Sequence, residues 1–163
     1  MEVLFKGKKE PLAVNQLKIG DKMPEFVLVD QNLEKIYSRD LKGVKLYITV
    51  PSIDTKVCSI EVAKFMHILK DYAITGLSIS KDLPFALNRW CPDKTSLNVK
   101  AVSDYYDGSF GFASGTLMPQ YNLLARAILL VDEQNIVRYI QIVENVSSEP
   151  DYDEVLEAIN RLL

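Results

Sequence analysis

The chain has 163 residues, with 19 Lys and Arg against 22 Asp and Glu, two Cys and one His. A chain of this size buries roughly 70 % of its unfolded surface, so residues 1–163 are expected to form a single domain without a disulfide or metal scaffold. The net charge of −3 argues against a general nucleic-acid binder, which carries a basic surface.

No membrane segment is expected. The longest stretch without charge, residues 108–125, contains three Gly and a Pro and is too polar to span a bilayer. The N-terminus lacks the basic start and long apolar run of a secretory signal, so the expected location is the cytoplasm, where thiols are kept reduced. Two Cys and one His are too few for a structural zinc site, which predicts that no metal is bound.

The first third of the chain is rich in strand signals. Apolar runs at 3–5 and 12–14 flank a turn-forming segment, which predicts an N-terminal hairpin within about residues 1–15. Further strands are expected at 26–29 and at 44–50, the second apolar enough to be a buried central strand.

An amphipathic helix is expected after the loop 51–57, with Asp54 or Thr55 as its N-cap. Its apolar positions follow helical spacing and predict a buried face made of Cys58, Val62, Phe65, Met66 and Leu69. The opposite, polar face is expected to hold mostly Ser59, Glu61, Lys64 and Lys70.

The second half continues the alternation of strands and helices. Strands are predicted at 74–80, 99–102, 127–131 and 136–143, and helices at 84–91, 109–114 and from 150 onward. This order predicts an α/β fold in which helices flank a mixed sheet. A thioredoxin-like core suits it, because that core also joins a βαβ half to a terminal ββα half.

Cys58 is the residue most suited to chemistry. It follows a buried strand and a Pro-containing loop, in the first turn of the predicted helix. Free N–H groups and the positive end of the helix dipole stabilise a thiolate at such a place. Cys58 also shares the apolar face of the helix, so the alternative is an inert, packed thiol.

The segment Pro51-x-x-x-Thr55-x-x-Cys58 matches the active-site signature of peroxiredoxins, and the fuller string PSIDTxVC resembles their bacterial thiol peroxidase subfamily, the atypical two-cysteine type. Other segments extend the resemblance over nearly the whole chain. They are DLPFA at 82–86 followed by RWC at 89–91, LARA at 124–127 with VD at 131–132, EPDY at 149–152, and the N-terminal hairpin.

The resemblance implies a peroxiredoxin fold and residue roles. Cys58 would be the peroxidatic cysteine and Cys91 the resolving one, joined in a Cys58–Cys91 disulfide during turnover. Thr55 and Arg126 would complete the pocket, and Pro51 would shield it. The implied activity is reduction of hydrogen peroxide and alkyl hydroperoxides without any cofactor, with thioredoxin as the reductant and a homodimer as the assembly.

Alternatives remain for several of these residues. Arg126 among apolar residues is equally typical of a structural ion pair, and Cys91 of a packed thiol. His67 lies nine residues after Cys58 on the helix and points away from it, so it is expected to serve packing or the surface. Lys56, and the segment 116–123, depart from the family pattern and bear on pocket shape and substrate range.

Two other functions compete with a peroxidase. A redox sensor or chaperone-like binding protein on the same fold would keep a reactive Cys58 without needing rapid turnover. A thiol–disulfide oxidoreductase is disfavoured because the sequence has no C-x-x-C. The glycines at 108–115 lack the spacing of a phosphate-binding loop.

Overall fold

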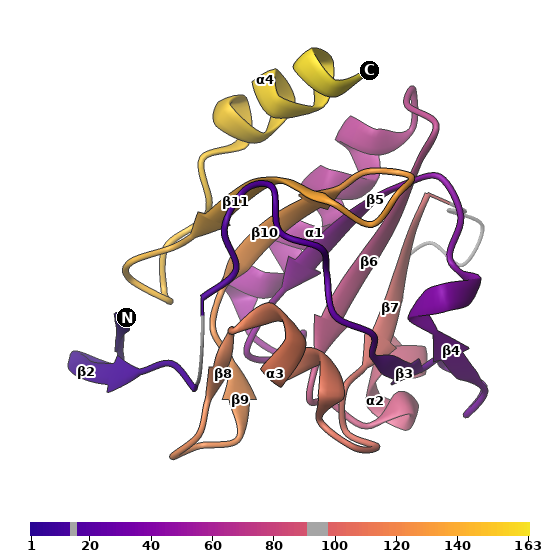
Figure 1. Ribbon diagram of the computed structural model, residues 1–163. Coiled ribbons are helices and arrows are strands. Elements are labelled where there is room, and N and C mark those ends of the chain that lie inside the picture. Colours follow the sequence, from indigo (N-terminus) through magenta and orange to yellow (C-terminus); the bar gives the residue numbers. More distant parts are fainter. Residues whose placement is uncertain (14–15, 91–97) are drawn as a thin grey trace.

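The computed structural model describes residues 1–13, 16–90 and 98–163. A seven-stranded mixed sheet forms its centre (Figure 1). From one edge to the other the strands are β11 (Val137–Ile142), β10 (Ala127–Val131), β5 (Val44–Thr49), β6 (Ile74–Ser80), β7 (Val99–Ser103), β3 (Val27–Val29) and β4 (Lys35–Tyr37). The predicted mixed-sheet α/β architecture is therefore confirmed.

The parallel part of the sheet contains β5, β6 and β7. Helix α1 (Lys56–Leu69) connects β5 to β6, and α2 (Pro84–Trp90) follows β6. Every residue of β5 is buried, as expected for a central strand covered on both faces. Because parallel strands all end at one edge of the sheet, the loop after β5 lies at the carboxyl edge, where α/β folds place their functional sites.

The remaining strands are antiparallel to their neighbours. Strand β10 pairs with β5 and with β11, and β3 pairs with β7 and β4. The closing helix α4 (Tyr152–Leu162) follows β11, with Asp151 as its N-cap. A short helix, α3 (Ser109–Ser114), matches the predicted bounds.

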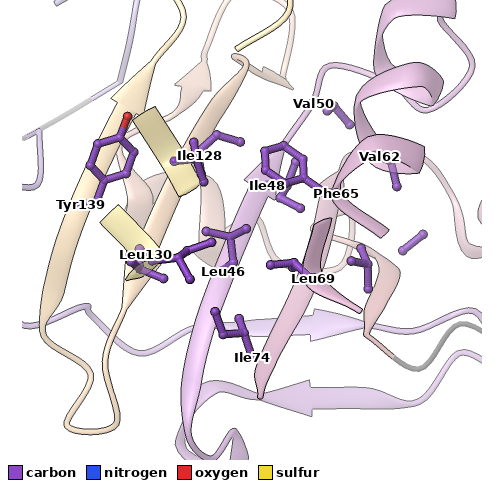
Figure 2. Packing of buried hydrophobic residues seen from close by; sticks show 14 of the residues in the cluster. Leu46, Ile48, Val50, Val62, Phe65, Leu69, Ile74, Ile128, Leu130 and Tyr139 are labelled. Carbon is purple, nitrogen blue, oxygen red and sulfur yellow. The ribbon is translucent and has the colours of Figure 1, made fainter. Parts of the chain in front are cut away.

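Helices cover both faces of the sheet (Figure 1). On one face, α1, α2 and α4 pack on the strands, and Figure 2 shows Val62, Phe65 and Leu69 of α1 facing Leu46 and Ile48 of β5. The other face packs against α3 through Phe110, Ala113 and neighbouring aromatic rings. These two apolar layers hold β5, and with it the start of the following loop, in a rigid frame.

The predicted N-terminal hairpin forms, but its second strand is misplaced in the prediction. Strands β1 (Glu2–Phe5) and β2 (Lys8–Pro11) are joined by Lys6 and Gly7, which have φ values of 51° and 79°. Two left-handed residues make the tight turn that suits a hairpin, so pairing begins directly at Phe5 and Lys8. Leu12 is instead buried in a small apolar cluster, and residue 14 lies outside the described residues.

The hairpin is attached to the end of the sheet. Leu4 forms a parallel bridge with Asn145, and its backbone exchanges hydrogen bonds with Glu144 O (2.8 Å) and Val146 N (2.9 Å). Val3, Phe5 and Val146 share the small apolar cluster. The segment after β11 is thus fixed by the N-terminus of the chain.

Short elements escape the sequence analysis. They are β4, the 3-10 helix η1 (Ser38–Asp40), and the ribbon of β8 (Leu117–Met118) and β9 (Leu123–Leu124). Each is two or three residues long and carries too few side chains for a periodic pattern to emerge. Within the described residues, no helix is long and apolar enough to cross a membrane.

Candidate active site

The loop between β5 and α1 delivers Cys58 to the site. Pro51 lies two residues after the end of β5 and is buried, and it cannot continue the ladder because proline has no N–H. Helix α1 begins at Lys56, two residues before the predicted start, with Thr55 as its N-cap. Cys58 therefore lies in the first turn, as predicted, with its side chain fully buried.

Thr55 uses its hydroxyl for the helix. The Cys58 backbone N–H donates to Thr55 Oγ1 (3.2 Å), and Thr55 Oγ1 donates to the Ser52 carbonyl (3.4 Å). Of the two expected caps, Thr55 is the one observed. The cap fixes the backbone of the residue that carries the thiol.

Arg126 brings a positive charge to the sulfur. Its Nη2 donates to Cys58 Sγ over 3.2 Å, and its side chain is 2 % exposed. Nε donates to the Val146 carbonyl (2.8 Å), which orients the plane of the guanidinium. A buried cation with a free donor edge at a sulfur stabilises the thiolate form.

The backbone around Arg126 is equally constrained. Thr49 at the end of β5 donates its hydroxyl to the Ala125 carbonyl (2.7 Å) and pairs with Ala127. Arg126 thus precedes β10 beside the strand from which the Pro51 loop departs. Arg126 directly precedes β10 and the loop that leads to Cys58 follows β5, so two neighbouring strands of one rigid sheet position the guanidinium and the thiol.

Glu61 is the functional residue that sequence reasoning places wrongly. The prediction assigns it to the polar face of α1, but its side chain is fully buried and forms an ion pair with Arg126 Nη1. Its other oxygen, Oε1, has no hydrogen-bond partner among the described residues. The available signal was its position three residues after Cys58, which puts the two side chains on adjacent turns of one face.

Burial shifts the pKa of Glu61, whereas neighbouring charges decide that of Arg126. Desolvation raises the pKa of Glu61 to about 7, although the charge of Arg126 and its hydrogen bond oppose the shift. For Arg126 burial lowers the pKa, but Glu61 and Cys58 outweigh it and raise the pKa overall. The guanidinium therefore remains charged, while Glu61 gains or loses its proton near neutral pH.

The remaining candidates lie apart from this cluster or outside the described residues. His67 is exposed on the outer side of α1, beside Ile60, Ala63 and Tyr152, as expected for a surface residue. Lys56 is the exposed first residue of α1. Cys91 lies outside the described residues, so its role stays a prediction.

The cluster offers thiol chemistry rather than a metal centre within the ranges the structure covers. No group of three or more His, Cys, Asp or Glu side chains there could hold a metal ion. What the site provides is one thiol, at a helix N-terminus, next to a guanidinium. Such a thiolate is a nucleophile with donors positioned to receive negative charge.

The chain is similar to known proteins over almost its full length. Residues 18–156 match the family model described as Redoxin. The thiol peroxidase of Clostridium acetobutylicum is 44 % identical over 161 residues, which cover 97 % of each chain. That of Streptococcus parasanguinis is 39 % identical over 160 residues, 97 % of this chain and 98 % of the relative.

Solved structures agree with this result. A peroxiredoxin-like protein from Aquifex aeolicus superposes with a TM-score of 0.92 at 34 % identity, covering 99 % of this chain and 97 % of its own. The thiol peroxidase from Chromobacterium violaceum gives a TM-score of 0.88 at 22 % identity over 98 % of this chain and 95 % of its own, a likeness of fold. The predicted thioredoxin-like peroxiredoxin fold is confirmed, and the chain belongs to the redoxin family, among its thiol peroxidases.

Proposed function

We propose that the chain reduces hydrogen peroxide and organic hydroperoxides, with Cys58 as the attacking thiolate. The observation that carries the proposal is the 3.2 Å contact from Arg126 Nη2 to Cys58 Sγ at the start of α1. An arginine committed only to structure would be satisfied by Glu61 and Val146; this one also points a donor at the thiol.

The first step transfers one oxygen to sulfur. The Cys58 thiolate attacks the terminal oxygen of the peroxide, the O–O bond breaks, and a sulfenic acid forms on Cys58. The departing oxygen leaves with the electron pair of that bond and takes up a proton to become water or an alcohol. Negative charge moves from sulfur to oxygen, and Arg126 lies where it stabilises the charge at both places. Thr55 holds the attacking residue in place, and Pro51 keeps water from the thiol.

Cys91 completes the proposed cycle. Its thiol condenses with the sulfenic acid, giving an intramolecular Cys58–Cys91 disulfide and one water. Cys58 is fully buried in the first turn of α1, so the proposed cycle includes a local unwinding of that turn to bring its sulfur within the narrow range of disulfide geometry. Thioredoxin then reduces the disulfide by thiol–disulfide exchange, and its own dithiol becomes oxidised.

The proposed setting is a cytoplasmic homodimer. A cycle that depends on reduced thioredoxin suits a compartment in which thiols are kept reduced. The apolar side chains of Leu83 and Phe85, beside and on α2, are 53 % and 70 % exposed and are candidates for a contact between subunits. Sedimentation of the purified chain tests the assembly, and a monomer at all concentrations would contradict it.

Three proteins test the chemistry: wild type, Cys58→Ser and Cys91→Ser, assayed for peroxide consumption with thioredoxin and for intact mass. Cys58→Ser should be inactive. Cys91→Ser should react once and then stall as a sulfenic acid, while the wild type turns over through a form lighter by two hydrogens. Peroxide consumption by Cys58→Ser at the wild-type rate would sink the proposal. Reactivity of Cys58 without turnover would favour a redox sensor.

A further inference from the structure

Asp82 connects the active-site loop to the segment that follows β6. Its Oδ1 accepts a hydrogen bond from Ser52 Oγ (2.8 Å), and its Oδ2 accepts one from the Ile53 backbone N–H (2.7 Å). Both donors lie between Pro51 and Thr55, about thirty residues earlier in the chain. Hydrogen bonds to a carboxylate are stronger than those between neutral groups, so Asp82 holds residues 52 and 53 of this loop firmly.

Asp82 is itself held by hydrogen bonds from the ends of two strands. Ser80 Oγ at the end of β6 donates to Asp82 Oδ2 (2.9 Å), and Ser103 Oγ at the end of β7 donates to the Asp82 carbonyl (2.5 Å). Both serines are buried, 2 % and 0 % exposed. The carboxylate is therefore presented to the loop from a rigid support.

The loop that Asp82 holds is connected to Cys58 by further hydrogen bonds. Ser52 Oγ also accepts from the Asp54 N–H (3.1 Å), and the Ser52 carbonyl accepts from Thr55 Oγ1. Thr55 in turn caps the amide of Cys58. A short chain of hydrogen bonds thus runs from the carboxylate to the residue that bears the reactive sulfur.

The same residue stands at the entrance to the other cysteine's segment. Two residues after Asp82 begins α2 (Pro84–Trp90), and Cys91 follows that helix in the sequence. Asp82 therefore ties the loop that precedes one cysteine to the segment that leads to the other. Movement of Cys58 away from its pocket would strain the hydrogen bonds from Ser52 and Ile53 to Asp82.

We infer that Asp82 is a positioning residue that acts as a latch: it holds the Cys58 loop in the peroxide-reactive arrangement and has to release that loop for the disulfide to form. The inference rests on the proposed function. A closed latch favours the first chemical step and slows the second, so weakening it should shift the two steps in opposite directions.

Asp82→Asn is the sharpest test because it preserves shape. Asparagine lacks the negative charge. With its oxygen at the Ile53 N–H, its NH2 keeps the contact with Ser52 only if the Ser52 hydroxyl turns from donor to acceptor, and with its NH2 at the Ile53 N–H that contact is lost. Oxidation of Cys58 should become about tenfold slower, a loss typical of imperfect positioning. Formation of the disulfide from the sulfenic acid should become several-fold faster.

Asp30→Asn is the matched control. Asp30 Oδ1 also accepts from backbone N–H groups of its own loop, those of Asn32 (2.8 Å) and Glu34 (3.0 Å), but it lies in the turn between β3 and β4 and has no part in the latch. Rapid-quench mass spectrometry, with a sulfenic-acid trap, counts the thiol, sulfenic and disulfide forms of each variant. Opposite changes in the two steps for Asp82→Asn alone support the latch. Changes in the same direction, or equal in both variants, overturn it.

A second measurement does not depend on peroxidase activity. Amide hydrogen exchange at Ile53 and Cys58 should accelerate in Asp82→Asn and stay near the wild-type rate in Asp30→Asn, because only the former frees the loop. Unchanged exchange in Asp82→Asn overturns the latch even if the chain is a peroxidase. Activity of the Cys58→Ser variant, by contrast, would contradict the proposed function, whereas the exchange rates test only whether Asp82 holds the loop.

Discussion

Arg126 and Cys58 are 68 positions apart in the chain, yet the guanidinium donates directly to the sulfur. The pairing of β10 with β5 produces this contact. Ala127 lies opposite Thr49, the last residue of β5, and the loop that leads to Cys58 follows β5. No local movement of α1 alone can carry the sulfur elsewhere without breaking this bond. In the proposed cycle, this contact belongs to the arrangement that attacks peroxide, and the sulfur has to leave it before a disulfide forms.

Replacing Arg126 with Lys should reduce kcat/KM about a hundredfold, the size of effect seen when one donor to developing charge is lost. Lysine keeps the charge, but a single ammonium cannot serve Cys58, Glu61 and Val146 in the fixed directions of a guanidinium. Peroxide kinetics at saturating thioredoxin measure the loss. Arg138→Lys, at the Arg138–Asp132 ion pair, is the control and should stay close to wild type. Equal activity in both variants would show that the guanidinium has no role.

Glu61→Gln should flatten the pH dependence of stability. The folded state raises the pKa of Glu61 from 4.5 to about 7, so ionisation costs the folded protein more than the unfolded one. The benefit of the protonated form is complete below pH 4.5 and is lost as the pH rises to about 7. Over that window the wild type should lose about 1 to 3 kcal/mol that the variant keeps.

Urea unfolding of both proteins across this window measures the effect. Glu157→Gln on the exposed side of α4 is the control, and its unfolding free energy should follow that of the wild type. Parallel curves for Glu61→Gln and the wild type would mean that Glu61 is ionised throughout, with Arg126 fully compensating its burial.

Thr55→Val should separate capping from size. It removes the acceptor for the Cys58 amide while keeping the shape of the side chain, and it should lower the free energy of unfolding by about 1 kcal/mol. The rate of Cys58 oxidation should fall with it, and Thr55→Ser should restore both. Asp151→Ala removes the equivalent cap of α4 and should cost similar stability at an unchanged rate. A rate loss as large in Asp151→Ala would reduce Thr55 to a purely structural cap.

Gly76→Ala should destabilise the fold by about 1 to 3 kcal/mol through overpacking. A Cβ at Gly76 would lie 2.9 Å from the Asn98 carbonyl oxygen, from Leu69 Cδ1 and from Val99 Cγ2. The neighbouring Thr75 is exposed, and Thr75→Ala should change stability by at most about 0.5 kcal/mol. Thermal unfolding of the two variants gives the comparison, and equal melting temperatures would contradict the close approach of α1 and β7 at this point.

Much of the fold follows from local pattern. The apolar run of β5 and the helical spacing of Val62, Phe65 and Leu69 reflect burial against one core, and burial is what periodicity reports. The cap at Thr55 and the place of Cys58 follow from the same local rules. These features depend on a few consecutive residues and on the apolar face that they share.

Glu61 shows where such reasoning fails. A charged residue is normally assigned to the exposed face of a helix, and only a partner from a distant part of the chain makes its burial tolerable. That partner, Arg126, is placed by strand pairing, which one sequence does not reveal. For the same reason the contacts of Asp82 with Ser52 and Ile53 leave no trace in periodicity, although each residue is visible in the sequence.

The attachment of the N-terminal hairpin has a consequence for the site. Leu4 binds the backbone of Glu144 and Val146, and the carbonyl of Val146 orients the Arg126 guanidinium through Nε. Strand β1 thus supports, through Val146, the Arg126 side chain that contacts the sulfur of Cys58. Fraying of the first few residues, by truncation or by a bulky fusion at Met1, would loosen the aim of Arg126 while every residue of the pocket remained unchanged.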